Sequence, residues 1–231
     1  MFESSEVPEK RQILKLLLQN PTVKEKKLGF SYWAPLTGRC SNLFGGVDII
    51  KYLDILLDML RLVLPSKKYM KEFTAYIREL YKRKEISKKE FNDKIKRNKD
   101  INAFLKRLKD DRNGINLEKN KIAYTIYWLV NGKKYIGTLR LNKRLNKKLR
   151  IRGGHIGYVI RPSERKKGYG AKILRLGLLK AKTKGLKKVL IDCRENNIAS
   201  KKIIEANGGV FIKKKRVKGE PASLHYYINV K

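Results

Sequence analysis

The chain has 231 residues, of which 42% are apolar, so it can bury a hydrophobic core and is not a wholly disordered protein. Its 57 Lys and Arg residues outnumber its 21 Asp and Glu residues, and the resulting net charge of +36 attracts anions such as nucleic acid, acidic lipid or a phosphorylated cofactor. The two cysteines show no CxxC pattern, which excludes a disulfide scaffold and a cysteine zinc site, and we expect no metal centre.

The first 60 residues differ from the rest and are expected to form an extension of unknown role. The acidic start, Met1–Pro8, lacks the apolar core of a signal peptide, and we expect a cytoplasmic protein. Val47–Leu64 has apolar residues at helical spacing but is interrupted by charges, which predicts an amphipathic helix and no membrane span. The runs Lys10–Leu14, Asn20–Thr22 and Leu28–Phe30 resemble the C-terminal tail of large serine recombinases, without a catalytic motif.

From residue 61 onward, local patterns predict one mixed domain. Its expected elements are helices at 67–83 (capped by Ser66), 87–97 and 102–109, strands at 122–130, 134–141 and 155–160, a helix at 168–184, a strand at 188–193, a helix at 197–206, and strands at 210–217 and 224–230. Asn131-Gly132 is a strong hairpin signal, because both residues accept a positive φ. The later strand–helix–strand order indicates a central parallel step. The fold class is therefore α/β, with a mixed, mostly antiparallel sheet flanked by helices.

The loop from Arg165 to Gly170, between a predicted strand and a predicted helix, carries the clearest chemical signal. Gly168 and Gly170 let the backbone approach a ligand, and the helix start offers free N–H groups and a positive dipole end to phosphate. Three cationic side chains precede the glycines and add charge-assisted hydrogen bonds. No GK[ST] follows, which excludes a P-loop. Ile173 stands in place of the third glycine of GxGxxG, which excludes the Rossmann fingerprint. The loop therefore predicts a pyrophosphate cradle of another class, with a plain turn before a helix as the alternative.

The residues around this loop resemble motif A of the GNAT acetyltransferases, a strand followed by R/Q-x-x-G-x-G/A and a helix. Here Gly157–Pro162 is followed by Arg165-x-x-Gly168-x-Gly170. Asn197–Gly209 resembles the second half of the fold, and 112–116 with 153–158 resemble a bacterial subgroup of predicted acetyltransferases. The resemblance implies a GNAT domain over residues 61–231, a central splayed pair of parallel strands, and acetyl-CoA as cosubstrate.

The resemblance also implies a role for each residue of the motif. Backbone groups of Tyr158, Val159 and Ile160 would bind pantetheine and the acetyl carbonyl, much as a sheet edge binds an added strand. Asn197 would hydrogen-bond the pantetheine arm, serve as a plain helix cap, or do both. The diphosphate would be held by Arg165, Lys166, Lys167, Gly168, Tyr169, Gly170 and Ala171.

Amine acetylation needs acid–base chemistry, for which four residues are candidates. A neutral amine must lose a proton, and His155 lies where related enzymes often place a carboxylate. Glu195 is a second candidate base, although each of the two could instead be a structural or solvated residue. The family's acid is often a tyrosine in the helix after residue 197, but Ile204 stands there and cannot donate a proton. Tyr226 or Tyr227 is the candidate substitute, unless both are packing residues and the thiolate leaves unaided.

Two functions of different classes fit the sequence. The first is an N-acetyltransferase that transfers an acetyl group from acetyl-CoA to an amine acceptor by direct attack, as the resemblance implies. The second is a catalytically weak GNAT-fold protein that binds nucleic acid or the ribosome, an idea motivated by the missing tyrosine and the net charge. Bulk composition would explain the charge without an acidic or nucleic-acid partner. The acceptor and the oligomeric state, a homodimer included, stay open.

Overall fold

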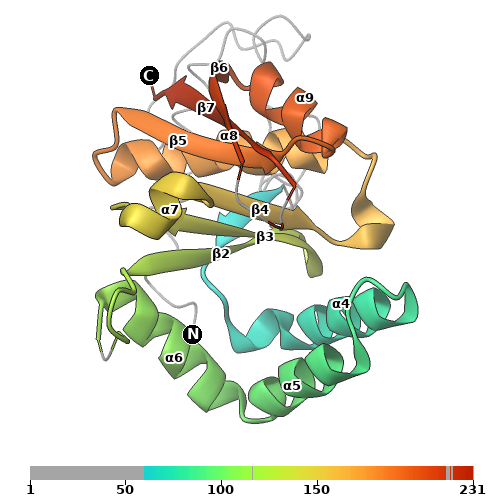
Figure 1. The fold of residues 1–231 in the computed structure, drawn as a ribbon. Helices are drawn as coiled ribbons and strands as arrows, with labels where there is room; N and C mark the ends of the chain where they lie inside the picture. The colour runs from blue at the N-terminus through green and yellow to red at the C-terminus, as the bar shows by residue number, and fades with distance from the viewer. Residues whose placement is uncertain (1–59, 116, 217–218, 220, 231) are drawn as a thin grey trace, which may run out of the picture. The chain divides into compact units, whose positions relative to one another are not determined.

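The computed structural model describes residues 60–115, 117–216, 219 and 221–230. The chain divides into two compact units, Met1–Tyr52 and Leu53–Lys231, and the described residues all belong to the second. The expected extension over residues 1–60, with its recombinase-like runs, lies outside the described residues except for Leu60. The elements, labelled in Figure 1, are β1 (Arg61–Val63), η1 (Lys67–Tyr69), α4 (Met70–Lys82), α5 (Lys88–Lys99), α6 (Ile101–Asn113), β2 (Tyr124–Asn131), β3 (Lys134–Asn142), α7 (Lys147–Ile151), β4 (Ile156–Ile160), η2 (Pro162–Glu164), α8 (Tyr169–Thr183), β5 (Lys188–Arg194), α9 (Ile198–Ala206), β6 (Val210–Lys215) and β7 (Ser223–Asn229).

Four strands form a first sheet in the order β1-β2-β3-β4, and all neighbouring pairs are antiparallel. The predicted β2–β3 hairpin is confirmed, but its turn lies one residue later than expected. Asn131 pairs with Lys134, so the central turn residues are Gly132 and Lys133. Gly132 has a φ of 56° and occupies the first central position, which is the glycine position of a type II′ turn.

The strand β1 corrects the prediction for the end of the Val47–Leu64 segment, where the apolar spacing favours a helix. Arg61–Val63 instead pairs with residues 128–130 of β2. A short apolar run is ambiguous between helix and strand, and here backbone pairing with the edge of β2 decides the outcome. The predicted helix at 67–83 is present as η1 and α4, although the Ser66 side chain makes no capping hydrogen bond.

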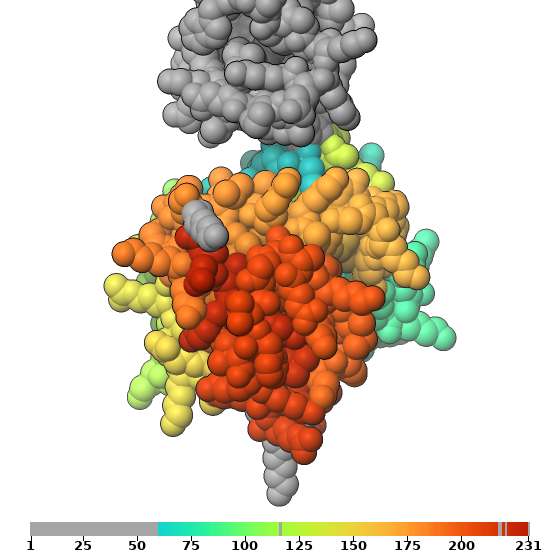
Figure 2. Space-filling view, turned by 90° about the horizontal axis from the view of Figure 1, so that it is seen from above, coloured from blue at the N-terminus to red at the C-terminus, as the bar shows by residue number. Residues whose placement is uncertain are grey.

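Three strands form a second sheet in the order β5-β7-β6, again with antiparallel pairs. The α/β class is thus confirmed, whereas the parallel pair is not found among the described strands, because β4 and β5 are edge strands of two separate sheets. The two edges meet at His155, whose N–H donates to the Leu190 carbonyl (2.7 Å), while the Leu190 N–H donates to His155 Nδ1 (2.9 Å). Seen from above, elements of the C-terminal part of the chain form most of the described surface (Figure 2).

Two hydrophobic clusters cover opposite faces of the first sheet. One includes Leu129, Leu139 and Ile173, all fully buried, and joins the sheet to α8, α9 and the second sheet. The other cluster is largely aromatic, and in it Phe73 of α4 stacks on Trp128 of β2 with ring centroids 4.6 Å apart. Figure 1 shows α4, α5 and α6 together on that side of the sheet. Aromatic burial therefore fixes this helical layer to the sheet.

Neither a membrane span nor a metal centre is found in the part of the chain that the structure describes. No helix there combines the length and the apolar character that crossing a bilayer requires. No group of three or more His, Cys, Asp or Glu side chains there is placed to hold a metal ion.

Candidate active site

The start of α8 is open to a ligand. Gly168 precedes the helix in the left-handed conformation, with a φ of 77°, and no side chain caps it. The Lys172 N–H donates to the Gly168 carbonyl at 3.3 Å. The N–H groups before it belong to the first turn of the helix, where N–H groups have no acceptor within the helix. A Cβ at Gly168 would meet no atom within 4 Å, so the space in front of the helix is free. Free N–H groups and the positive end of the helix dipole make this an anion site.

Lys166 shares the left-handed conformation of Gly168. Its φ of 63° is uncommon for a residue with a side chain, while Lys167 between the two does not have a positive φ. Alternation of this kind turns successive N–H groups toward one side and forms a concave anion-binding arrangement. This feature of the loop could not be predicted from the sequence, because a lysine carries no signal for a positive φ.

Gly170 and Asn197 connect α8 with α9. A Cβ at Gly170 would lie 2.5 Å from Ile203 Cδ1 on α9, so this glycine is explained by helix packing and not by ligand approach. The Asn197 Oδ1 atom accepts a hydrogen bond from the Ser200 N–H (3.0 Å), which is the capping role that the sequence left as one alternative. A hydrogen bond from Asn197 to a ligand would therefore come from its Nδ2 amide group.

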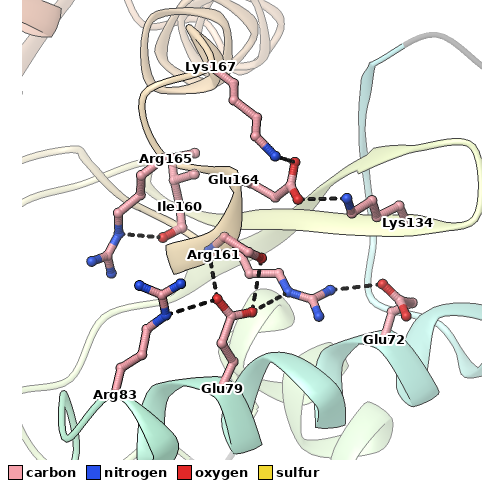
Figure 3. Close-up of polar contacts among 10 residues, drawn as sticks. Glu72, Glu79, Arg83, Lys134, Ile160, Arg161, Glu164, Arg165 and Lys167 are labelled. Carbon is pink, nitrogen blue, oxygen red and sulfur yellow. Dashed lines mark hydrogen bonds and ion pairs between the residues drawn. The ribbon is translucent and has the colours of Figure 1, made fainter.

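Two of the three cationic side chains in the loop are held by carboxylates. Arg165 donates from its two terminal nitrogens to Glu85 (2.9 and 2.6 Å) and from Nε to the Ile160 carbonyl (3.2 Å). Lys167 Nζ lies 3.2 Å from a carboxylate oxygen of Glu164 (Figure 3). The two side chains that were expected to hold a diphosphate are therefore paired within the protein in this structure.

Glu164 is a buried carboxylate that fixes the loop to the β2–β3 hairpin. Its side chain is only 4% exposed and accepts from Lys134 at 2.6 Å as well as from Lys167 (Figure 3). Burial alone would raise the pKa of Glu164, but the hydrogen bonds from Lys134 and Lys167 outweigh it, and the pKa is lowered. Glu164 is therefore ionised at neutral pH and holds the loop in place.

Arg161, at the end of β4, fixes the same loop to α4. Its Nε donates to Glu79 (2.8 Å) and its terminal nitrogen to Glu72 (2.9 Å), as Figure 3 shows. Glu79 also accepts from the N–H (2.6 Å) and the hydroxyl (3.0 Å) of Ser163. Burial acts to raise the pKa of Glu79, yet these hydrogen bonds lower it overall. Glu79 lies seven positions after Glu72, which places both on one face of α4, but their distant partner gives no local signal in the sequence.

The β4 edge offers only part of the backbone that was expected to bind pantetheine. The Arg161 N–H donates to the Ile136 carbonyl on β3 (2.9 Å). Backbone groups alternate in direction along a strand, so Val159 also faces β3, while Tyr158 and Ile160 face the open edge. The Ile160 carbonyl is occupied by Arg165. The open edge therefore presents the N–H and carbonyl of Tyr158 and the N–H of Ile160.

An uncapped helix start beside an open strand edge matches the motif seen in the sequence, and comparison with known proteins agrees. The family described as an acetyltransferase (GNAT) domain matches residues 62–210. The chain belongs to the GNAT acetyltransferase family. No match was found among the curated proteins.

Solved structures show the same GNAT fold. The Microcin C7 self-immunity acetyltransferase MccE, solved with acetyl-CoA and AMP, has a TM-score of 0.53 at 16% identity, over 75% of this chain and 93% of its own. A protein from Bordetella pertussis assigned to the GNAT family has a TM-score of 0.50 at 13% identity, over 73% of this chain and 94% of its own. At such low identity the likeness establishes the fold alone.

His155 joins the two sheets of this GNAT domain, and its geometry does not support the role of general base. Its Nδ1 accepts the Leu190 N–H, so the neutral ring carries its proton on Nε2. Uptake of a second proton would break this hydrogen bond between the sheets. Burial is the largest influence on the pKa of His155 and lowers it, and the charge of Arg150 lowers it further.

Glu195 and Tyr226, two further catalytic candidates, lie on different elements, and no hydrogen bond joins either of them to His155. Glu195 follows β5, is about half exposed and pairs with Lys214 on β6. Tyr226 lies on β7 and is almost fully buried, and burial is the main reason why its pKa is raised. Cys193 on β5 is buried, and burial raises the pKa of its thiol to about 11, which fits a core residue and not a nucleophile.

The Tyr158 hydroxyl is a feature of the site that sequence reasoning missed. It is buried and makes no hydrogen bond to any described residue. Ser200 on α9 lies near enough to lower the pKa of Tyr158 slightly, but not in hydrogen-bonding geometry, and burial dominates and raises that pKa to about 12. The family motif points to the Tyr158 backbone and gives no signal about its side chain.

Acid is expected to destabilise the contact between the two sheets. The chain contains two histidines, and burial lowers the pKa of both His155 and His225. Each histidine makes a hydrogen bond to the backbone of another element. His225 donates from Nε2 to the Ile151 carbonyl (3.0 Å), and His155 accepts from the Leu190 N–H. A pKa that is lower in the folded state means that the unfolded chain binds more protons, so stability is complete above about pH 6.5 and falls below it.

Urea unfolding at steps between pH 8 and 5.5 measures this loss of stability. Replacing both histidines with glutamine should remove most of the pH dependence. A wild-type chain whose unfolding free energy stays constant over this range would contradict the assignment.

Proposed function

We propose that this GNAT protein is an N-acetyltransferase that transfers an acetyl group from acetyl-CoA to an amine acceptor by direct attack. The observation that carries the proposal is the uncapped start of α8, with left-handed backbone at Lys166 and Gly168, beside the open edge of β4. A diphosphate is an anion that such N–H groups bind, and a pantetheine arm is an extended chain that a strand edge binds. The unpartnered Tyr158 hydroxyl also fits a ligand with polar atoms at this place.

In the proposed reaction, the residues of this chain act mainly by placing the two substrates. The N–H groups of the 166–171 loop hold the diphosphate, and the backbone of Tyr158 and Ile160 orients the arm along β4. The acceptor nitrogen attacks the acetyl carbon, so that a C–N bond forms and the C–S bond breaks. The proton that the nitrogen loses balances the charge of the departing thiolate. Glu195 is the accessible candidate for removing this proton, because its pairing with Lys214 is at the surface and weak.

The net charge of +36 favours a neutral or acidic environment around the acceptor amine. A strongly cationic enzyme repels free polyamines, since like charges raise the free energy of the encounter. We therefore place the acceptor amine on a molecule that carries few additional positive charges.

Acetyl-CoA should stabilise the wild-type protein, and Gly168→Val should lose this response. Saturating ligand is expected to raise the Tm by about 5–10 °C, because binding to the folded state alone adds stability. A valine at residue 168 disfavours the left-handed φ of 77° and fills the space in front of α8. Thermal unfolding with and without acetyl-CoA at constant ionic strength measures the effect.

Gly185→Val is the matched control, because Gly185 lies at the other end of α8, has a φ of 79° and also has no atom within 4 Å of an added Cβ. Both variants should lose similar intrinsic stability, but only the one at residue 168 should lose the ligand response. The proposal fails if acetyl-CoA does not stabilise the wild type, or if both variants respond equally.

A further inference from the structure

The Tyr158 hydroxyl is the feature of the fold that the proposed reaction leaves unexplained. Among the described residues, only it and Arg61 Nε are buried polar side-chain atoms without a hydrogen-bond partner. A buried hydroxyl without a partner costs stability, so native proteins usually keep one only where a water or ligand completes it. The hydroxyl is therefore prepared for a group that the free chain does not supply.

The surroundings of this hydroxyl place it in the core where the two sheets meet. Tyr158 extends from the middle of β4 and packs against the cluster that contains Cys193 of β5. Two neighbours affect the ionisation of the Tyr158 hydroxyl: Cys193 on β5 and Ser200 in the first turn of α9. The hydroxyl thus lies among β4, β5 and α9, next to the open strand edge on which the pantetheine arm is proposed to lie.

The helix α9 offers no donor at the position where the family's tyrosine is expected. Ile204 occupies the helix position where related acetyltransferases often carry a tyrosine, and it is fully buried and apolar. Ser200 lies one helical turn before Ile204, on the same face of α9. The hydroxyl of Tyr158, beside Ser200, therefore reaches the area that the missing tyrosine would serve. Tyr226 is a weaker candidate, because its hydroxyl is not among the buried atoms without a hydrogen-bond partner.

We propose that the Tyr158 hydroxyl donates a hydrogen bond to the sulfur of bound coenzyme A and stabilises the departing thiolate, in place of the tyrosine that α9 lacks. This inference rests on the proposed function. The hydroxyl keeps its proton over the range in which enzymes work, since its pKa is about 12. It therefore acts as a hydrogen-bond donor and not as an acid that transfers its proton completely. Hydrogen bonds to charged groups are the stronger kind, which suits a donor aimed at a thiolate.

The direct test uses free coenzyme A and Tyr158→Phe, and needs no acceptor. A donor to the sulfur favours the thiolate, so the thiol of coenzyme A bound to the wild type should titrate about one pH unit below the free thiol. In Tyr158→Phe this shift should disappear, which corresponds to an affinity for the thiolate about tenfold weaker. Ultraviolet absorbance of the thiolate between pH 6 and 10 measures the titration, and calorimetry measures the affinity.

Desulfo-coenzyme A, which lacks the sulfur, identifies the atom that the hydroxyl contacts. Its Kd should be the same for the wild type and Tyr158→Phe. An equal loss of affinity for both ligands would place the hydroxyl on the pantetheine arm and overturn the proposal. An unchanged thiol titration in the variant would also overturn it, while leaving acetyl-CoA binding intact. A wild type that binds no coenzyme A would refute the proposed function as well.

Stability of the free protein provides an independent readout. Removing an unpartnered hydroxyl should leave the Tm of Tyr158→Phe within about 1 °C of wild type or raise it. Tyr135→Phe is the matched control, because the Tyr135 hydroxyl bonds Thr138 at 2.6 Å in the aromatic cluster on the opposite face of the sheet. Tyr135→Phe should lower the Tm by about 3 °C and leave the affinity for coenzyme A unchanged. A Tm loss in Tyr158→Phe as large as in the control would show that its hydroxyl has a partner in the free protein.

Discussion

Arg161→Ala is expected to lower the free energy of unfolding by about 2–3 kcal/mol, because in a partly buried site it removes the cation of Glu72 and leaves Glu79 with only a longer contact to Arg83. Arg161 and Glu79 side chains are only 13% and 17% exposed, and the hydrogen bonds from Arg161 to Glu72 and Glu79 are short. The variant should also weaken acetyl-CoA binding, since this ion-pair group holds the loop that leads into α8. Urea unfolding and calorimetric titration measure the two effects.

Arg83→Ala is the matched control for this prediction. Arg83 contacts the same Glu79 carboxylate, but at 3.4 Å and with 54% of its side chain exposed. Its loss should cost less than about 1 kcal/mol, as is usual for a surface ion pair. Arg161→Lys should lie between the two, because lysine keeps the charge and loses the planar pair of donors. Equal losses for Arg161→Ala and Arg83→Ala would contradict the role of Arg161.

Gly154→Ala should destabilise the protein by about 3 kcal/mol or more, because it combines backbone strain with a collision between the two sheets. Gly154 has a φ of 59°, and a Cβ there would lie 2.3 Å from the Leu190 carbonyl oxygen. The same carbonyl accepts the His155 N–H, so moving β5 aside would break the contact at which the sheets meet. Chemical unfolding of the purified variant gives the value directly.

Gly208→Ala separates the two causes. Gly208 also has a left-handed backbone, with a φ of 81°, but a Cβ there would meet no atom within 4 Å. Its substitution should cost only the strain, about 1 kcal/mol. If the two alanine variants lose the same stability, the close approach of Gly154 to β5 does not matter for the fold.

Elements with a strong local pattern could be predicted from the sequence. The β-rich run before residue 131 and the adjacent glycine predict the β2–β3 hairpin, and the apolar face of α8 predicts that helix. Strand β1 could not be predicted, because three residues pair with a strand more than 60 positions away. The five-residue helix α7, capped by Asn146, is likewise too short for a periodic signal.

The open start of α8 could be predicted from the sequence, whereas the contacts of the side chains around it could not. Arg165 looks unpaired in the sequence, because its carboxylate partner is distant along the chain and is identified only once the chain has folded. Glu85, the partner of Arg165, is 80 residues away. His155 looks like a general base for the same reason, since its hydrogen bond with Leu190 depends on how the sheets meet. Residues that carry charge are therefore the hardest to assign from sequence alone.

A crystal structure with acetyl-CoA bound would decide whether the start of α8 holds the diphosphate. We expect the diphosphate oxygens to lie within hydrogen-bonding distance of the N–H groups of residues 166–171. We also expect the pantetheine arm to follow the open edge of β4. Acetyl-CoA bound elsewhere, or a loop whose N–H groups are satisfied by the protein's own side chains while ligand is saturating, would contradict this account.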